Sequence, residues 1–206
     1  MAHLQAPAGA ARSALLIAFE GLDQSGKQTQ AEQLRDRLAA SGRAVRLLSF
    51  PAYDTPIGKE IQQALTGARA WGADVMQLLY IANRYEAKPQ IEDALARGDV
   101  LICDRYVASS IAYGESQGLD ASWLREVQRR LPQPDITFLL DLAPEVSARR
   151  KTSDRDAYER DLALLGRVRD SYIRQSASRD WVRLDADRAR EEVASDVFEA
   201  VRPLLL

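Results

Sequence analysis

The stretch FEGLDQSGKQTQ, residues 19–30, decides how this chain folds. It begins at the end of the apolar run of residues 14–20, which is typical of a strand buried on both faces. Gly21, Gly26 and Lys27 have the G-x-x-x-x-G-K spacing of a phosphate-binding loop. Residues 28–40 then show the apolar spacing of a helix, so both flanks that such a loop requires are predicted.

This loop predicts a site for a nucleoside triphosphate such as ATP. Its glycines allow main-chain N–H groups to approach phosphate oxygens, and the following helix directs its positive end at the anion. Lys27 can bridge the outer phosphates. The residues expected to bind ATP are Gly21, Leu22, Asp23, Gln24, Ser25, Gly26, Lys27, Gln28 and Thr29. Gln28 stands where a Ser or Thr usually binds Mg²⁺, so we expect its carbonyl oxygen or a water molecule to take that place.

The rest of the chain alternates apolar strands with helices. Strands are expected at residues 14–20, 45–50, 100–104, 136–141 and 181–184. Helices are expected at 28–40, 57–65, 75–96, 109–117, 121–130, 158–179 and 191–204. Asp74 should cap the third helix, and Pro89 should kink or divide it. This order predicts an α/β fold of the P-loop NTPase type, a doubly wound five-stranded parallel sheet with helices on both faces.

Two segments differ from this pattern. Residues 1–13 are rich in Ala, Gly and Pro and are expected to form a flexible N-terminal tail before a single domain at 14–206. Residues 149–158 are charged and almost without apolar side chains, which indicates an exposed loop or a short lid. As a lid, its Arg149, Arg150 and Arg155 could close over a phosphoryl group during transfer and exclude water.

Composition excludes several classes of protein. The 206 residues include 28 Lys and Arg against 30 Asp and Glu, so no basic excess points to nucleic acid. The longest apolar runs are a few residues, whereas a membrane span needs about 20. Cys103 is the only cysteine and His3 the only histidine, which argues against a disulfide framework, a cysteine zinc site and histidine catalysis. We expect a cytoplasmic protein.

A second group of polar residues follows the third strand. The carboxyl ends of central strands face the ligand crevice in a doubly wound sheet, so Asp104 is expected near a metal ion and Arg105 near phosphate oxygens. Taken alone, this pair could also be a surface ion pair. Asp23 adds negative charge inside the phosphate loop, where it could be a solvated turn residue, face a sugar hydroxyl, or lie near the metal and an acceptor phosphate.

One expected helix carries an aromatic and a basic residue on the same face. Tyr80 and Arg84 are four residues apart, so together they could stack on a base and bind its carbonyl edge. Core packing with a surface arginine is the alternative for such a helix face.

Five segments together resemble the thymidylate kinase family. They are FEGLDQSGKQTQ (19–30), SFPAYDTPIGKEI (49–61), LLYIANRYE (78–86), DRYVASSIAYG (104–114) and LPQPDITFLLDL (131–142). The resemblance implies transfer of the ATP γ-phosphate to dTMP, giving dTDP and ADP, with Mg²⁺, in dTTP biosynthesis. It also suggests a homodimer.

The resemblance implies a role for each matching residue. Lys27 and the loop amides would hold the donor phosphates, and Asp23 would lie between acceptor and metal. Tyr80 would stack on thymine, Arg84 would contact its edge, and Arg105 would hold the acceptor phosphate. The remaining acceptor contacts would come from Phe50, Pro51, Tyr53, Ser109, Ser110 and Tyr113.

Two departures from the family pattern matter. Many relatives have an arginine just after the Phe–Pro pair, whereas this chain has Ala52 and Tyr53, so a tyrosine hydroxyl could replace one phosphate contact. Some relatives have an arginine in the phosphate loop. This loop has none, which assigns stabilisation of the transition state to the arginines of the lid.

The expected mechanism is direct in-line transfer without a covalent intermediate, because the acceptor phosphate is already ionised and needs no strong base. Two other functions stay open from the residues alone. One is a different phosphate-loop kinase of nucleosides or nucleotides, against which Arg105 argues. The other is a nucleotide-binding regulatory module without turnover, which the unusual Gln28 favours.

Overall fold

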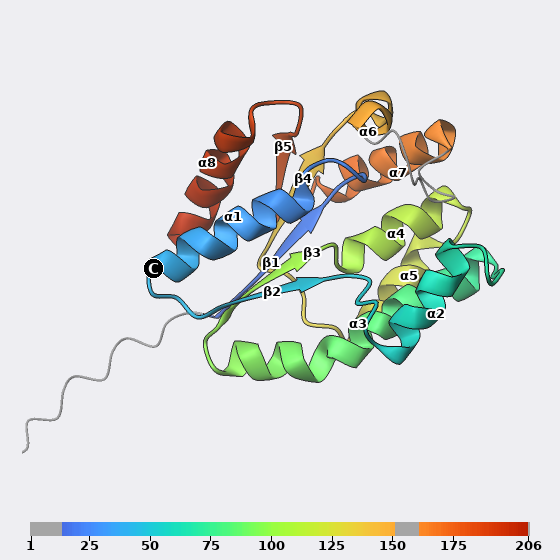
Figure 1. The fold of residues 1–206 in the computed structure, drawn as a ribbon, viewed down its shortest axis with the longest axis horizontal. Helices are drawn as coiled ribbons and strands as arrows, with labels where there is room; N and C mark the ends of the chain where they lie inside the picture. The colour runs from blue at the N-terminus through green and yellow to red at the C-terminus, as the bar shows by residue number, and fades with distance from the viewer. Residues whose placement is uncertain (1–13, 151–160, 206) are drawn as a thin grey trace, which may run out of the picture.

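The protein is built around one five-stranded parallel sheet. The computed structural model describes residues 14–150 and 161–205 of the 206, so the expected tail and most of the expected lid lie outside the described residues. The strands are β1 (Leu15–Glu20), β2 (Val45–Ser49), β3 (Val100–Asp104), β4 (Ile136–Asp141) and β5 (Trp181–Asp185). Their spatial order is β2-β3-β1-β4-β5, with every pairing parallel (Figure 1). The predicted sheet is confirmed.

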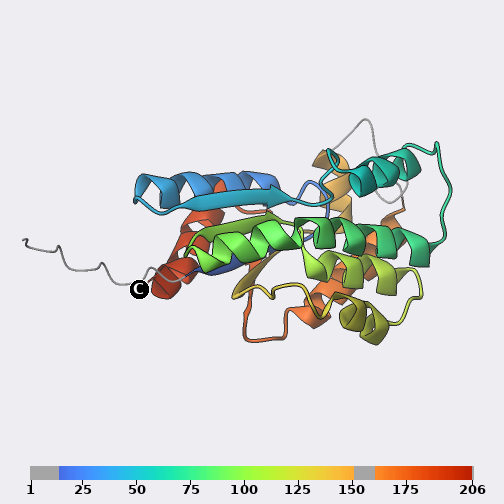
Figure 2. The ribbon, with the colours of Figure 1, turned by 90° about the horizontal axis from the view of Figure 1, so that it is seen from below.

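Helices cover both faces of the sheet (Figures 1 and 2). One face packs against α1 (Lys27–Ala40) and α8 (Arg190–Val201). The other packs against α3 (Ala73–Ala96), α4 (Val107–Ser116) and α7 (Leu162–Gln175). The remaining helices are α2 (Pro56–Leu65), α5 (Ala121–Gln128), α6 (Pro144–Arg150) and the 3-10 turn η1 (Arg202–Leu205).

The phosphate loop begins at the end of β1, which is a fully buried strand. All six of its residues are buried, because the strand lies in the middle of the sheet. Ile17 and Phe19 face the core under α1 and α8, while Leu16 and Ala18 face the core under α3. A continuous apolar run is therefore required here, and its end at Glu20 fixes where the loop begins.

The third helix differs from the sequence prediction. It begins at Ala73 after Gly72, which offers no side-chain cap, so Asp74 is not the capping residue. Pro89 lies inside the helix without dividing it. Residues on both sides of Pro89 are held in the core, including Ile81 and Ile91, and this packing offsets the backbone hydrogen bond that proline removes.

Because all strands are parallel, their carboxyl ends lie at the same edge of the sheet, where the arrowheads point in Figure 1. The chain reverses its direction of winding beside β1, between β3 and β4, which is where open parallel sheets bind ligands. Among the described residues, no helix combines the length and the apolar character needed to cross a membrane.

Candidate active site

The phosphate loop connects β1 to α1 in a conformation that depends on glycine. Gly21 has φ 140° and Gly26 has φ 91°. A Cβ atom at Gly21 would lie 2.5 Å from the main-chain oxygen of Leu140, so the close approach of β4 leaves no room for a side chain. Gln24 also has a left-handed backbone, with φ 60°. Such conformations are uncommon in non-glycine residues and occur often at ligand sites.

Lys27 is buried at the start of α1. Its Nζ donates to the main-chain oxygen of Leu22 at 2.8 Å, which tethers the ammonium group to its own loop. Burial, followed by the nearby charge of Arg105, lowers the pKa of Lys27 to about 8. A polyanion would restore the charged form, so this lysine is poised to respond to phosphate.

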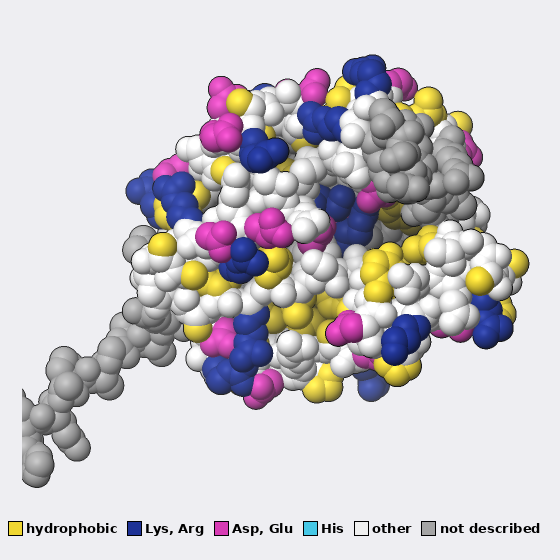
Figure 3. Space-filling model, viewed as in Figure 1, with side chains coloured by type: hydrophobic (Ala, Val, Ile, Leu, Met, Phe, Trp, Pro, Cys, Tyr) yellow, Lys and Arg dark blue, Asp and Glu magenta, His cyan; other side chains and the backbone are white. Residues whose placement is uncertain are grey.

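Three neighbouring cavities follow the carboxyl edge of the sheet. The loop cavity is lined by Asp23, Gln24, Gly26, Lys27, Gln28, Thr29, Phe50, Asp104 and Arg105. The α8 groove adjoins it and includes Gln24, Ser25, Gly26, Thr29, Arg150 and Arg188. The α3 pocket is lined by Asp23, Phe50, Pro51, Tyr53, Leu65, Gln77, Tyr80, Arg84, Arg105, Ser109, Ser110 and Tyr113. Figure 3 shows a recess with basic and acidic side chains in its depth.

The α3 pocket brings together all of the residues that the family resemblance implies for the acceptor. They come from α3 and α4 and from the loops that follow β1, β2 and β3, and they are spread over 91 positions from Asp23 to Tyr113. Leu65 and Gln77 complete the wall without having been predicted. Gln77 lies in the same helix as Tyr80 and Arg84, so the helical spacing alone could have suggested it.

Asp23 and Arg105 form the wall between the α3 pocket and the loop cavity. Arg105 Nη2 lies 2.6 Å from Asp23 Oδ1, and Arg105 Nη1 donates to the main-chain oxygen of Gly21 at 3.1 Å. Arg105 has φ 63°, so its backbone turns sharply where β3 ends. These contacts hold a planar guanidinium at the boundary, which suits binding of a phosphate by two parallel hydrogen bonds.

Glu20 contacts Arg105 indirectly, through Ser109 and Tyr172, and it was not among the predicted site residues. Its Oε1 accepts from the main-chain N–H groups of Tyr106 and Ser109, at 2.8 Å and 3.2 Å. Its Oε2 accepts from the hydroxyls of Ser109 and Tyr172, at 2.6 Å and 3.0 Å. Both hydroxyl oxygens in turn accept from Arg105 Nη1, at 3.3 Å and 3.4 Å. The buried carboxylate therefore fixes the start of α4 and orients two partners of Arg105.

Arg84 carries a second positive charge in the α3 pocket, and this one is buried. Its Nη1 donates to Ser110 Oγ at 2.6 Å and to the main-chain oxygen of Tyr80 at 3.3 Å, and its Nε finds no hydrogen-bond partner among the described residues. Burial lowers the pKa of Arg84, and the described residues form no ion pair with it. A buried guanidinium with free donors suits the carbonyl edge of a ligand.

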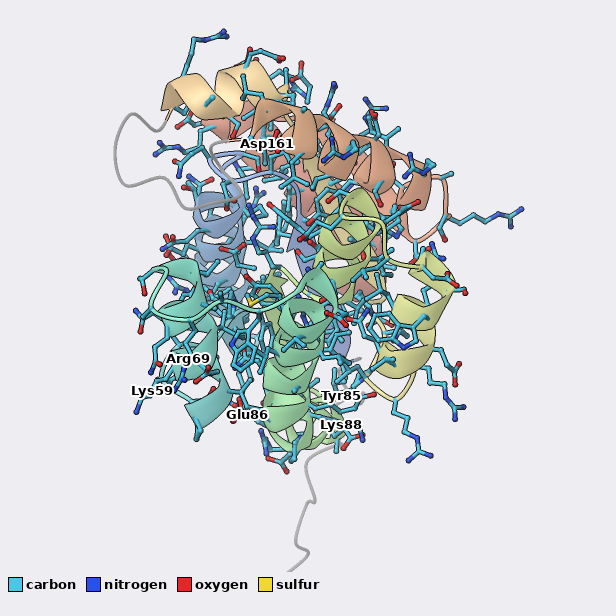
Figure 4. All side chains as sticks on the ribbon, turned by 90° about the vertical axis from the view of Figure 1, so that its right-hand side faces the viewer. Lys59, Arg69, Tyr85, Glu86, Lys88 and Asp161 are labelled. Carbon is cyan, nitrogen blue, oxygen red and sulfur yellow. The ribbon has the colours of Figure 1, made fainter. Side chains whose placement is uncertain are left out.

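Asn83 positions one wall of the pocket from the other side of the same helix. This fully buried amide accepts from the main-chain N–H of Ala52 at 2.8 Å and donates to its oxygen at 3.2 Å. It also donates to Thr55 and Glu86. The loop containing Phe50, Pro51 and Tyr53 is thereby fixed to α3, whose Tyr85, Glu86 and Lys88 are labelled in Figure 4.

Asp104 lines the loop cavity with a buried oxygen, Oδ1, that finds no hydrogen-bond donor among the described residues. A carboxylate of this kind beside a phosphate site suits Mg²⁺, which takes one or two protein carboxylates together with substrate phosphates and water. No cluster of three or more His, Cys, Asp and Glu ligands occurs in the described ranges. The Gln28 side chain is exposed and donates to Glu32 at 2.9 Å.

Two of the three expected lid arginines lie in the described part of the chain, at the end of α6. Arg150 donates to the main-chain oxygens of Gln24 and Ala186, both at 3.1 Å, and pairs with Asp187 at 2.9 Å. It thus connects the phosphate loop to the chain between β5 and α8. Arg149 is exposed and does not line the described cavities, and Arg155 lies outside the described residues.

This geometry can hold two phosphorylated ligands end to end. A triphosphate in the α8 groove and the loop cavity would have its outer phosphate beside Lys27 and Asp104. A second phosphate in the α3 pocket would meet Arg105, and the Asp23–Arg105 pair would lie at the boundary between the two phosphates.

Comparisons with known proteins agree with this arrangement. Residues 19–197 match the family model described as Thymidylate kinase. The chain is 37% identical over 204 residues to a thymidylate kinase of Halothermothrix orenii, covering 93% of this chain and 98% of that protein. It is 33% identical over 191 residues to that of Schizosaccharomyces pombe, covering 90% of each. A solved thymidylate kinase structure from Candida albicans superposes with a TM-score of 0.82 at 30% identity, covering 93% of this chain and 92% of that one.

Proposed function

The chain belongs to the thymidylate kinase family, and from this membership we propose that it transfers the γ-phosphoryl group of ATP to dTMP, giving dTDP and ADP for dTTP synthesis. The observation that carries the proposal is the shared wall. Asp23 and Arg105 line both the loop cavity and the α3 pocket, so donor and acceptor phosphates would meet there.

The protein would act mainly by positioning two polyanions and reducing their repulsion. Lys27 and the main-chain N–H groups of residues 21–28 would hold the donor phosphates. Arg105 would hold the acceptor phosphate, with Asp23 keeping its guanidinium in place. An oxygen of the acceptor phosphate would attack the γ-phosphorus in line while ADP leaves, and the acceptor is already ionised, so no general base is required.

The other end of the acceptor would enter the α3 pocket. Tyr80 would stack on the thymine ring, Arg84 would donate to its edge, and Phe50 and Pro51 would border it beside Ser109 and Ser110. Tyr113, whose hydroxyl donates to Asp23 at 3.4 Å, would lie against the deoxyribose and crowd a 2′-hydroxyl. Tyr53 lines the same pocket and would supply a hydroxyl to the acceptor.

Asp104 is the residue we propose to hold Mg²⁺, because its Oδ1 is buried beside the phosphate loop and meets no donor in the described part of the chain. Gln28 and Thr29 line the same cavity and would contribute through an oxygen atom or a water molecule. When bound, the ion neutralises negative charge that develops on the transferred phosphate.

The arginines of the lid are proposed to stabilise the transition state, since the phosphate loop contains no arginine. Arg150 already lies against the loop through Gln24, which favours it as a donor-side group. Arg149 and Arg155 remain candidates for the same role. We also propose a homodimer in the cytoplasm, with no nucleic-acid or membrane partner, on the basis of the family and the charge balance.

The decisive experiment is an acceptor screen. The protein is incubated with ATP, Mg²⁺ and one of dTMP, dUMP, dCMP, AMP or thymidine, and ADP and the phosphorylated product are quantified together. We expect dTMP to give the highest kcat/KM and Lys27→Ala to abolish turnover. Faster use of thymidine or another nucleotide would replace this function with a different kinase activity, and no ADP formation with any acceptor would leave a binding module.

A further inference from the structure

Gln77 has a buried side-chain amide that forms no hydrogen bond to the described residues. Its side chain is completely buried, and neither Oε1 nor Nε2 finds a hydrogen-bond partner among the described residues. Native proteins leave few buried polar atoms without partners, and such exceptions often mark a ligand site. Gln77 also lines the α3 pocket, so this residue borders the space where an acceptor would bind.

The surrounding helices hold this amide in place. Gln77 and Arg84 are seven residues apart on α3, which places them on one face about 10 Å apart along the helix axis. Tyr80 lies between them on that face. Opposite, α4 presents Gly114, where an added Cβ would lie 3.2 Å from Gln77 Cγ. The glycine therefore leaves room for the aliphatic part of the Gln77 side chain.

The chemistry of the two ends is complementary to one class of base. Arg84 offers only donors, whereas the Gln77 carboxamide offers one donor and one acceptor side by side. A pyrimidine with an imide edge presents a carbonyl oxygen, an N–H and a second carbonyl oxygen in a row. One arginine and one carboxamide can therefore bind all three groups.

We propose, on the basis of the proposed function, that Gln77 is a specificity residue of the acceptor site that binds this imide edge. Oε1 accepts from the ring N–H, and Nε2 donates to the carbonyl oxygen beside it, while Arg84 binds the other carbonyl. A cytosine edge has an amino group at the position that faces Arg84, and donor meets donor there. Cytosine also lacks the ring N–H, so its ring nitrogen and Gln77 Oε1 would meet as two acceptors, and both Gln77 and Arg84 select for the imide.

The test replaces the Gln77 amide with an apolar side chain of similar volume. Gln77→Met and Gln77→Leu are compared with Gln128→Met. Gln128 is another buried glutamine whose side-chain oxygen has no partner within residues 14–150 and 161–205, but it lies in α5, outside the pocket. KM and kcat are measured for dTMP, dUMP and ATP, and melting temperature is measured for each variant. Because dTMP and dUMP share the imide edge, their KM values should rise by the same factor, about tenfold or more, with kcat nearly unchanged.

Two further readouts separate this role from a structural one. The KM for ATP should stay at the wild-type value. The melting temperature of Gln77→Met should not fall, because the Gln77 amide forms no hydrogen bond to any of the described residues. Gln128→Met should keep the wild-type KM for both acceptors. Wild-type acceptor KM values in Gln77→Met and Gln77→Leu would overturn the inference, as would a loss confined to dTMP, which would indicate packing on the methyl group.

Failure of the proposed function looks different. In that case the wild-type protein itself does not phosphorylate dTMP, and calorimetry then tests Gln77 directly. Weaker dTMP and dUMP binding in Gln77→Met than in Gln128→Met would still support the inference, and equal binding would overturn it.

Discussion

Lys27 has its ammonium group in an almost water-free position, and this has a consequence for nucleotide binding. Its pKa is lowered to about 8, so near pH 8 a large fraction of the free protein carries a neutral lysine. Phosphate favours the charged form, so binding should take up a proton, and ATP affinity should fall as the pH rises above 8.

Calorimetric titration with ATP near pH 8, in two buffers of different ionisation enthalpy, measures this proton uptake. The wild-type protein should take up a fraction of one proton for each ATP bound, and Lys27→Ala should bind more weakly without that contribution. Identical heats in both buffers for the wild-type protein would contradict the assignment.

Arg105 should not tolerate replacement by lysine. Arg105→Lys keeps the charge but loses the planar fork that contacts Gly21, Asp23 and the two hydroxyls oriented by Glu20. We expect kcat/KM for dTMP to fall by about 100-fold or more at saturating ATP. Arg97→Lys is the matched control, because Arg97 forms its ion pairs on the surface, and it should keep wild-type kinetics. A loss of less than about threefold in Arg105→Lys would show that charge alone is sufficient.

The local sequence could predict those site residues whose positions are set by a short motif or by the end of the strand that precedes them. The spacing of Gly21, Gly26 and Lys27 and the positions of Asp104 and Arg105 after a strand are local signals, and they place these residues correctly at the edge of the sheet. Glu20 could not be assigned in this way, because its hydrogen-bond partners lie 86 to 152 residues further along the chain. The free amide of Gln77 likewise becomes visible only when α4 is packed against α3.

At the scale of elements, the main chain of β4 lies so close to the phosphate loop that it limits which residue can stand at position 21. Gly21→Ala would place a Cβ 2.5 Å from the Leu140 oxygen at a backbone φ of 140°. We expect a loss of about 1–3 kcal/mol in the free energy of unfolding, with weaker ATP binding. Gly166→Ala in α7 meets no atom within 4 Å and should instead stabilise the protein by about 0.5–1 kcal/mol. Denaturant unfolding measures both, and equal midpoints for the two variants would contradict the packing argument.

Most elements could be predicted within a few residues, because parallel strands buried on both faces are continuous apolar runs. β1, β3 and β4 begin and end almost where the sequence indicates. The third helix was the exception. Pro89 is a strong local signal for a break, but the buried residues on both sides keep α3 continuous, so tertiary packing outweighs local preference. The predicted tail and the predicted lid beyond Arg150 lie outside the described residues.

At the scale of the whole molecule, the proposed donor and acceptor sites are separate cavities that share Asp23, Phe50 and Arg105. Each ligand should therefore stabilise the protein independently. At about 100 times its Kd, either ligand should add about 2.7 kcal/mol, which raises the melting temperature by roughly 5–10 °C for a chain of this length.

Lys27→Ala separates the two effects. Its melting temperature should respond to dTMP as the wild-type protein does and respond little to ATP, because Lys27 lines the loop cavity and not the α3 pocket. Loss of both responses would mean that the cavities do not act as separate binding sites. Thermal denaturation with each ligand alone, and with both, provides the measurement.

The unbroken course of α3 has a consequence for how this enzyme can evolve. One helix carries Gln77, Tyr80 and Arg84 on the pocket side and Asn83, which fixes the Phe50–Pro51 loop. The spacing of these residues along the helix therefore fixes the positions of the contacts that they make. One residue inserted between Gln77 and Arg84 would turn everything beyond it by about 100° around the helix axis and would separate base recognition from that loop. Surface connections can lengthen in descendants of this sequence, but the span from Gln77 to Arg84 must keep its length.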